Sequence, residues 1–335
     1  MKTLFYIVII CFSFVLQASC QDNDNKAIVD SEETDESEKD LIAIDLLKDT
    51  NFQTGFIHRG NTTDNVKNNI IATNSQVRPE WQLAQWFSNY VLTENDLKIT
   101  SEDSYSLGND ANKISVVQDE NGQSVLSFFS SSKMDYGENT VRLAGDPWPH
   151  FLFSQDINTC PPLNKMESIF FRINARVKSW KINYPELYNE KIHAARFRLN
   201  FIVKNINKNS EAFNDYYWFV MTFFDNRHLF MPETGKLDEG TDNKKGSGKY
   251  IYGSDAKQYL NKSLHELDWV SIDLDILPLI KLGLQQAQKG EYLPESDKLE
   301  DYAIRYFNFG YELTANIDIE SQIKKLSVTA YIEEQ

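Results

Sequence analysis

Two stretches of alternating apolar and polar residues, broken only by Phe170 and Ile202, constrain the fold of this chain more than any other feature. In residues 168–178 and 195–204, every odd-numbered position from 169 to 177 and from 195 to 203 is apolar. Successive side chains of a β-strand point to opposite faces, so each stretch predicts a long strand with one buried face. Residues 216–225 are instead almost continuously apolar and aromatic, which predicts a central strand buried on both sides, with Trp218 in the core.

The rest of the chain continues this strand-rich pattern. Turn residues such as Asn121 and Gly122 separate the segments. Further strands are expected at residues 52–57, 83–91, 113–118, 124–130, 140–144, 151–153, 269–274, 303–313 and 325–332. Many strands separated by turns predict an all-β fold, a two-sheet antiparallel β-sandwich with one or two short peripheral helices.

One helix is expected between Asp275, which suits the cap position, and Gly290, which suits its end. Pro278 falls in the first turn, where its missing N–H does no harm. The predicted buried stripe of this helix consists of Leu277, Ile280, Leu284 and Ala287.

The N-terminus has the pattern of a secretory signal peptide over residues 1–19. Lys2 precedes an apolar run at residues 4–16, which is too short to span a membrane. The sequence allows two kinds of processing. Ordinary signal peptidase would cleave near Ser19 or Cys20, or the chain would be processed as a lipoprotein. The sequence Leu16-Gln17-Ala18-Ser19-Cys20 resembles the bacterial lipoprotein motif, although Gln17 departs from it. That resemblance implies lipid attachment at Cys20, and a membrane contact through this lipid alone.

Residues 20–50 are expected to be a disordered tether, because they are acidic and contain no aromatic residue. An acidic run close behind the cysteine resembles the export signal of surface lipoproteins in glycan-degrading bacteria. The resemblance implies a bacterial outer-membrane location facing the exterior. A single sandwich domain is expected over residues 51–335.

The charge and the cysteines of the chain bear on which partners, disulfides and metal sites are expected. The net charge is −15, and residues 21–50 contribute −8 of it, from eleven acids and three lysines. An acidic domain is a poor nucleic-acid binder.

The cysteines leave two possibilities for Cys160, because Cys11 is removed with the signal peptide. Cys160 has no disulfide partner if Cys20 is acylated; otherwise a Cys20–Cys160 disulfide is possible. No zinc spacing occurs and no cofactor is expected, although the acidic stretch 238–242 offers oxygen ligands for a structural calcium ion.

The end of the chain supports a more specific comparison. Residues 306–313 (YFNFGYEL) and 323–331 (IKKLSVTAY) resemble the last strands of jelly-roll carbohydrate-binding domains and of lectin/glucanase-type sandwiches. The resemblance implies a jelly roll and a glycan ligand, and it transfers no catalytic residue. The Glu-x-Asp-x-x-Glu motif of laminarinase-type glucanases and the signature of alginate-lyase sandwiches do not occur.

The first candidate site is a basic face. Arg172, Arg176, Arg196 and Arg198 alternate outward on two consecutive strands, which we expect to pair as antiparallel neighbours. One guanidinium patch would then suit the carboxylate or sulfate groups of an acidic polysaccharide. The alternative, which is the more common arrangement, is that these arginines pair with Asp and Glu across the sheet.

A second candidate is Trp148 with His150. Pro147 and Pro149 flank the tryptophan, so its ring is expected to be a stiff surface on which a sugar stacks. The alternative is a buried tryptophan that anchors the start of a strand.

A third candidate follows the most apolar strand, where Asp225, Arg227 and His228 are expected on a loop. His228 would act as a general base with Tyr217 or Tyr252 as the acid, a pairing found in some polysaccharide lyases. Ordinary turn formation explains the same residues equally well.

Together these features favour a surface-anchored lipoprotein that binds an extracellular, acidic polysaccharide. A polysaccharide lyase or glycoside hydrolase on the same scaffold is the second hypothesis. A structural or adhesion lipoprotein without a sugar site is the third.

Overall fold

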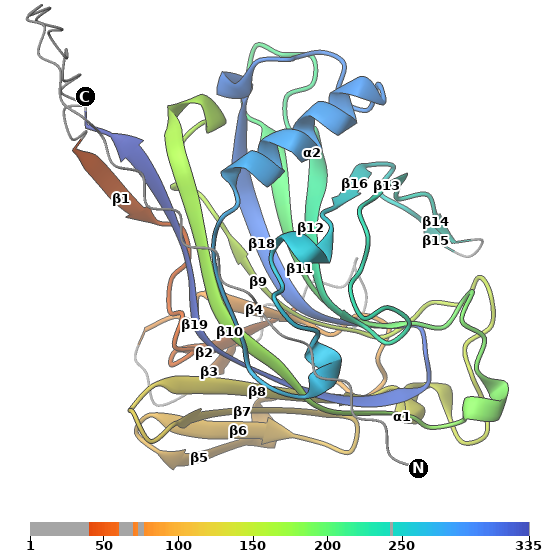
Figure 1. The fold of residues 1–335 in the computed structure, drawn as a ribbon. Helices are drawn as coiled ribbons and strands as arrows, with labels where there is room; N and C mark the ends of the chain where they lie inside the picture. The colour runs from red at the N-terminus through yellow and green to blue at the C-terminus, as the bar shows by residue number, and fades with distance from the viewer. Residues whose placement is uncertain (1–39, 60–69, 73–76, 242–243, 335) are drawn as a thin grey trace, which may run out of the picture. The chain divides into compact units, whose positions relative to one another are not determined.

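A computed structural model describes residues 40–59, 70–72, 77–241 and 244–334. The described chain forms two large β-sheets, which confirms the predicted all-β sandwich (Figure 1). The predicted signal peptide, Cys20 and the first part of the predicted tether lie outside the described residues. Within the described part, no helix is long and apolar enough to cross a membrane.

Sheet A has the strand order β17-β10-β19-β8-β7-β6-β5, and β1 pairs with β19. Its strands are β1 (Leu41–Asp45), β5 (Leu97–Ser101), β6 (Ser104–Gly108), β7 (Asn112–Gln118), β8 (Ser124–Ser131), β10 (Met166–Ile182), β17 (Val270–Asp275) and β19 (Ile317–Glu333).

Sheet B has the order β13-β16-β12-β11-β18-β9-β4-β2-β3. Its strands are β2 (Gly55–Arg59), β3 (Ile70–Ala72), β4 (Trp81–Ala84), β9 (His150–Asp156), β11 (Ala195–Asn205), β12 (Tyr216–Asp225), β13 (Thr234–Leu237), β16 (Tyr250–Gly253) and β18 (Tyr302–Leu313). A separate hairpin joins β14 (Gly240–Thr241) to β15 (Lys244–Lys245). The pairs β2/β4 and β12/β16 run parallel, so the prediction of purely antiparallel sheets is wrong at these two places.

Several successive strands lie in opposite sheets. The chain passes from β8 in sheet A to β9 in sheet B, back to β10 and then to β11; β17, β18 and β19 repeat the alternation. Such crossing between two facing sheets is the connectivity of a jelly-roll sandwich. Its consequence is that strands adjacent in sequence are often not neighbours in a sheet.

The core lies between the inner faces of the sheets. The odd-numbered side chains at positions 169–177 of β10 and 195–205 of β11 are buried there, as the alternation predicts. Aromatic rings pack across the interface: the Phe128 ring of sheet A lies 5.4 Å from that of Phe153 in sheet B, and Phe171 lies 6.3 Å from Phe201. The even-numbered side chains at positions 170–176 of β10 and 196–204 of β11 point away from the core.

The folded domain begins earlier than predicted. Strand β1 pairs along its whole length with β19, and Leu46 and Leu47 behind it are buried. The prediction that a disordered tether continues to residue 50 is therefore wrong for residues 41–50. The strand is short and lies among acids, so its sequence alone does not distinguish it from the tether.

Other boundaries differ from the predicted ones at the sheet edges. Residues 216–225 form β12 as predicted, whereas residues 140–144 form no strand and the strand predicted at 83–91 is only Trp81–Ala84. Strands β5, β6, β13 and β16 were not predicted. They are short, and their period-two pattern is weak.

The predicted helix is α2 (Leu277–Lys289), and its predicted stripe is buried. The Asp275 carboxylate accepts hydrogen bonds from the backbone N–H groups of Leu277 and Ile169, at 3.0 and 2.8 Å. Helix α2 contacts β10 of sheet A and β12 and β16 of sheet B. A four-residue helix α1 (Lys133–Tyr136) and short 3₁₀ turns lie outside the sheets, at Glu94–Asp96, Leu163–Lys165, Pro185–Leu187, Ala256–Gln258, Leu264–Glu266 and Leu299–Asp301.

Candidate functional site

The outward side of sheet B carries four of the predicted site residues, His150, Arg196, Arg198 and Asp225, and we call it the sheet-B face. Its members point away from the core on four neighbouring strands. They are Trp218 and Asp225 of β12; Arg196, Arg198, Asn200, Ile202 and Lys204 of β11; Tyr306, Asn308, Gly310 and Glu312 of β18; and His150, Leu152, Ser154 and Asp156 of β9.

Strand register aligns four charged or polar residues in one row across this face. Asp225 is opposite Arg196, Arg196 is opposite Glu312, and Glu312 is opposite His150. The row unites residues from the three separately predicted sites. The sequence analysis missed Glu312, although its even-numbered place on β18 marks it as outward-facing.

An ionic cluster forms one end of the row. The Asp225 carboxylate is fully buried and accepts hydrogen bonds from Arg227 Nε at 2.7 Å, Arg227 Nη2 at 2.6 Å and Arg196 Nε at 3.0 Å. Burial alone would raise the pKa of Asp225, but the hydrogen bonds from Arg227 and the charges of Arg196 and Arg227 outweigh it and lower the pKa to about 2. The carboxylate is therefore ionised and saturated with donors at neutral pH.

Arg198 continues the cluster towards the centre of the face. Its guanidinium is paired with Glu312 through Nη2 and Oε2. Burial, and then the charge of Arg196, lower the pKa of Arg198 to about 9. Its Nε atom is buried and has no hydrogen-bond partner.

Trp148 and His150 lie at the opposite end of the row. Their rings stack with centroids 5.5 Å apart, the Arg142 guanidinium lies 5.0 Å from the Trp148 centroid, and His150 Nδ1 contacts the Trp148 carbonyl at 2.9 Å. The indole is half-buried, and its Nε1 has no partner. The Trp148 ring is thus partly exposed and is held by neighbouring side chains. It is neither the freely exposed stacking surface nor the buried anchor that were the two predicted alternatives.

The predicted four-arginine patch is wrong, because β10 and β11 belong to different sheets. Arg172 pairs with Asp273 at 3.0 Å, and Arg176 binds Gln322 and lies over the Trp269 ring, all on sheet A. Residues 183–194 carry the chain across to sheet B. Three of the four arginines pair with an acid, which is the alternative arrangement considered from sequence.

The predicted pairing of His228 with Tyr217 is also wrong. Tyr217 is a core residue whose hydroxyl donates to the Ile280 carbonyl at 2.5 Å. His228 is exposed beyond a turn closed by its N–H and the Asp225 carbonyl at 3.0 Å. The Tyr252 hydroxyl donates to Glu233 Oε2 at 3.0 Å.

An aromatic group lies towards the end of the sheet-B face that is opposite the Asp225 row, since Trp218, Ile202, Tyr306 and Asp156 are aligned across the four strands. Trp218 lies edge-on to Tyr306 at 6.4 Å and to Tyr216 at 5.8 Å, and all three are half-buried. Beside them, Asn200 Nδ2 donates to Asn308 Oδ1 at 2.6 Å. The sequence analysis assigned Trp218 to the core; its even-numbered position on β12 was the signal that it faces outward.

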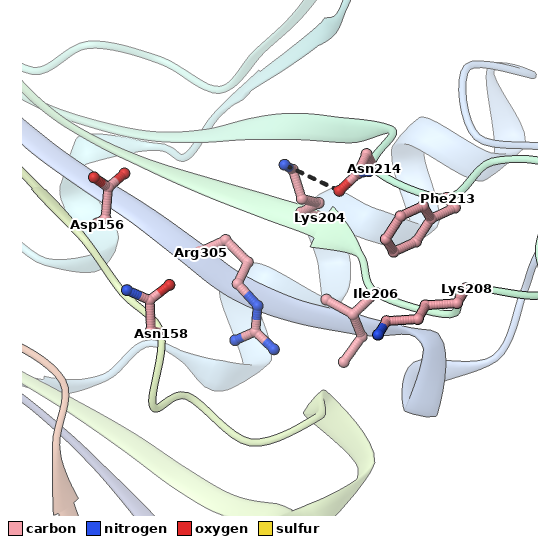
Figure 2. A pocket seen from close by; sticks show the side chains of 8 residues that line it. All are labelled: Asp156, Asn158, Lys204, Ile206, Lys208, Phe213, Asn214 and Arg305. Carbon is pink, nitrogen blue, oxygen red and sulfur yellow. Dashed lines mark hydrogen bonds between the residues drawn. The ribbon is translucent and has the colours of Figure 1, made fainter.

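The far end of the face opens into a hollow of about 490 Å³, shown in Figure 2. It lies where β9, β11 and β18 meet the loop before β12. Its lining residues are Asp156, Asn158, Lys204, Ile206, Lys208, Phe213, Asn214 and Arg305.

Among the described residues, no group of three His, Cys, Asp or Glu side chains is placed to hold a metal ion. In the stretch predicted to offer calcium ligands, the Asp238 carboxylate accepts hydrogen bonds from the Ser247 N–H and hydroxyl at 2.9 and 2.7 Å. Asp242 lies outside the described residues.

Comparison with known proteins gives structural neighbours only. No family model and no curated protein matches the sequence. A family 12 xyloglucanase from Bacillus licheniformis is 10% identical with a TM-score of 0.38, over 72% of this chain and 99% of its own. A cellulase derived from Rhodothermus marinus Cel12A is 11% identical with a TM-score of 0.34, over 65% and 91%. The xyloglucanase domain of NopAA from Sinorhizobium fredii is 12% identical with a TM-score of 0.32, over 67% and 96%. These similarities are too low to transfer an activity to this chain.

Proposed function

We propose that this protein binds an extracellular glycan along the sheet-B face, as a binding protein and not as an enzyme. The central observation is the aromatic group of Tyr216, Trp218 and Tyr306 beside the amide pair of Asn200 and Asn308. Sugar rings present apolar C–H faces that stack on aromatic rings, and their hydroxyls exchange hydrogen bonds with amides. The face therefore combines both kinds of contact that a glycan requires.

Unpartnered donors on the same face add to this argument. Trp148 Nε1, Ser154 Oγ and Arg198 Nε are each buried without a hydrogen-bond partner within the described protein. Buried polar groups in native proteins are nearly always satisfied, by protein, water or ligand. We expect ordered water to satisfy these buried donors and to bridge them to the hydroxyls of a bound saccharide.

The carboxylates of the row favour binding over hydrolysis. Glycoside hydrolysis needs one carboxyl group that is protonated near neutral pH and a second that is ionised. Asp225 has its pKa lowered to about 2, and Glu312 is paired with Arg198. Asp225 is therefore not the protonated acid that the reaction requires, and the Glu312 carboxylate is occupied by its ion pair.

Trp218→Ala is expected to weaken glycan binding about tenfold, because loss of one stacking ring removes roughly 1 kcal/mol or more. Binding is measured by isothermal titration against a panel of neutral and acidic polysaccharides. Trp269→Ala is the matched control, since Trp269 is also half-buried but directly precedes β17 and contacts Arg176 of sheet A. Equal weakening by both variants, or loss only in Trp269→Ala, contradicts the proposed face.

The same panel separates binding from catalysis. The wild-type protein is expected to release no reducing ends and no unsaturated uronate absorbance while it binds. Product release from any bound polysaccharide would replace the proposed function with the lyase or hydrolase hypothesis.

We also propose that the protein is anchored to the outer membrane, facing outward, through a lipid on Cys20. The support is the sequence pattern at residues 16–20 and the acidic run after it. Cys20→Ala is expected to move the protein from the detergent phase to the aqueous phase in detergent partitioning, because its membrane contact is the lipid alone. Cys160→Ala is the control, and unchanged partitioning of Cys20→Ala overturns the anchor.

A further inference from the structure

We propose that the hollow at the end of the sheet-B face is a subsite for an anionic group of the bound glycan, a uronate carboxylate or a sulfate ester. This inference rests on the proposed function and deepens it. An acidic ligand was first expected from four arginines on one face, and the structure separates those arginines. The residues that line the hollow give a separate reason to expect an acidic ligand.

The charge of the hollow is opposite to that of the chain as a whole. Lys204, Lys208 and Arg305 line it, whereas its one carboxylate, Asp156, accepts a hydrogen bond from Gln82 at 3.0 Å. In the described part of the chain, none of the three cations forms an ion pair. On a protein with a net charge of −15, three unpaired cations around one hollow are a local excess of positive charge.

Arg305 is aimed into the hollow by a β-bulge. Ile202 is opposite Tyr306 and Val203 is opposite Ile304, so Arg305 is the extra residue on β18. Bulges redirect a side chain relative to the regular alternation. Its Nη1 donates to the Cys160 carbonyl at 2.8 Å, which holds the guanidinium in place. Figure 2 shows it between Asn158 and Ile206.

Phe213 supplies an apolar surface on the other side of the hollow. Its side chain is 42% exposed although the loop that carries it is tightly hydrogen-bonded. The Phe213 N–H donates to the Ser210 carbonyl at 3.0 Å, the Asn214 N–H to the Asn205 carbonyl at 3.0 Å, and Asn207 Nδ2 to Asp301 Oδ1 at 2.9 Å. A rigid loop presents the ring without an ordering cost on binding.

These parts together match one acidic sugar residue. Guanidinium and ammonium groups bind carboxylate and sulfate oxygens, the amides of Asn158 and Asn214 suit hydroxyls, and the Phe213 ring suits a sugar face. A hollow of about 490 Å³ lies in the size range of small-ligand sites.

The test compares four polymers in two matched pairs: polygalacturonate with its methyl ester, and dextran sulfate with dextran. The wild-type protein is expected to bind at least one anionic member about tenfold or more tightly than its neutral partner, with affinity that falls as salt rises. The preferred pair identifies the anion as carboxylate or sulfate.

Lys208→Glu is expected to remove that preference, whereas Lys181→Glu is the matched control. Both lysines are exposed and both changes alter the net charge equally, but Lys181 lies on β10 of sheet A. Phe213→Ala is a second variant, expected to weaken both members of the preferred pair. Melting temperatures check that all variants fold.

The outcomes separate the two proposals. Absence of any anionic preference, or equal effects of Lys208→Glu and Lys181→Glu, overturns the anionic subsite. If neutral polymers still bind and Trp218→Ala weakens that binding, the proposed function survives this result. A protein that binds no polysaccharide of either kind overturns both.

Discussion

Replacing Asp225 with alanine is expected to lower the free energy of unfolding by about 3–5 kcal/mol. Its carboxylate is fully buried and holds both Arg196 and Arg227. Removal leaves two largely buried guanidinium groups without their counter-charge, and neither can lose its proton easily. Urea denaturation followed by tryptophan fluorescence measures the change.

Asp273→Ala is the control for that prediction. Asp273 also pairs with an arginine, Arg172, but its side chain is 62% exposed. Exposed ion pairs contribute about 0–1 kcal/mol, so this variant should be nearly as stable as the wild type. A loss below about 1 kcal/mol in Asp225→Ala would mean that the ionic cluster does not stabilise the fold, and would reopen a role for Asp225 at the ligand.

Gly310→Ala is the second large effect, with an expected loss of roughly 3 kcal/mol or more in the free energy of unfolding. The φ angle of Gly310 is +138°, which side chains with a Cβ rarely adopt, and an added Cβ would lie 2.1 Å from the Phe151 carbonyl oxygen of the adjacent strand. Backbone strain of this kind costs about 1–3 kcal/mol, and overpacking costs a similar amount again. Neither strand can move without disturbing the centre of sheet B. Urea denaturation again measures the change.

Gly122→Ala is its matched control. Gly122 also has a positive φ, +70°, but no atom lies within 4 Å of the position of an added Cβ. Only the conformational penalty applies there, about 1 kcal/mol. If the two variants lose equal stability, the close approach of β9 to Gly310 is not what requires a glycine. A folded Gly310→Ala protein would also show whether the sheet-B face tolerates movement between Arg198 and Leu152, its neighbours in register.

Local pattern alone determined the long alternating strands of this protein and its one long helix. Odd positions 169–177 of β10 and 195–205 of β11 are buried as the alternation predicts, and α2 lies between Asp275 and Gly290 with Pro278 in its first turn. These features depend on neighbours within a few residues, so the sequence carries them directly.

Two wrong predictions show what the local sequence pattern does not determine. The all-apolar run of β12 hides its period, so Trp218 was assigned to the core and Tyr217 to a site, whereas each side chain points the other way. The sequence of β1 resembles that of the predicted tether, and its pairing with β19 is what makes it a strand. In both cases, the deciding information lies far away in the chain.

The choice of sheet for each strand was decided by the tertiary structure alone. β10 and β11 have the same alternation, and nothing in that period says whether two such strands pair or face each other across a core. Their separation divides the four arginines, joins Arg196 and Arg198 to Asp225 and Glu312, and brings Lys204, Lys208 and Arg305 around one hollow. The sequence thus determined which side chains face outward on the clearly alternating strands β10 and β11. Only the crossing of the chain between two sheets determined which of them meet, because pairing depends on long-range packing that no local period records.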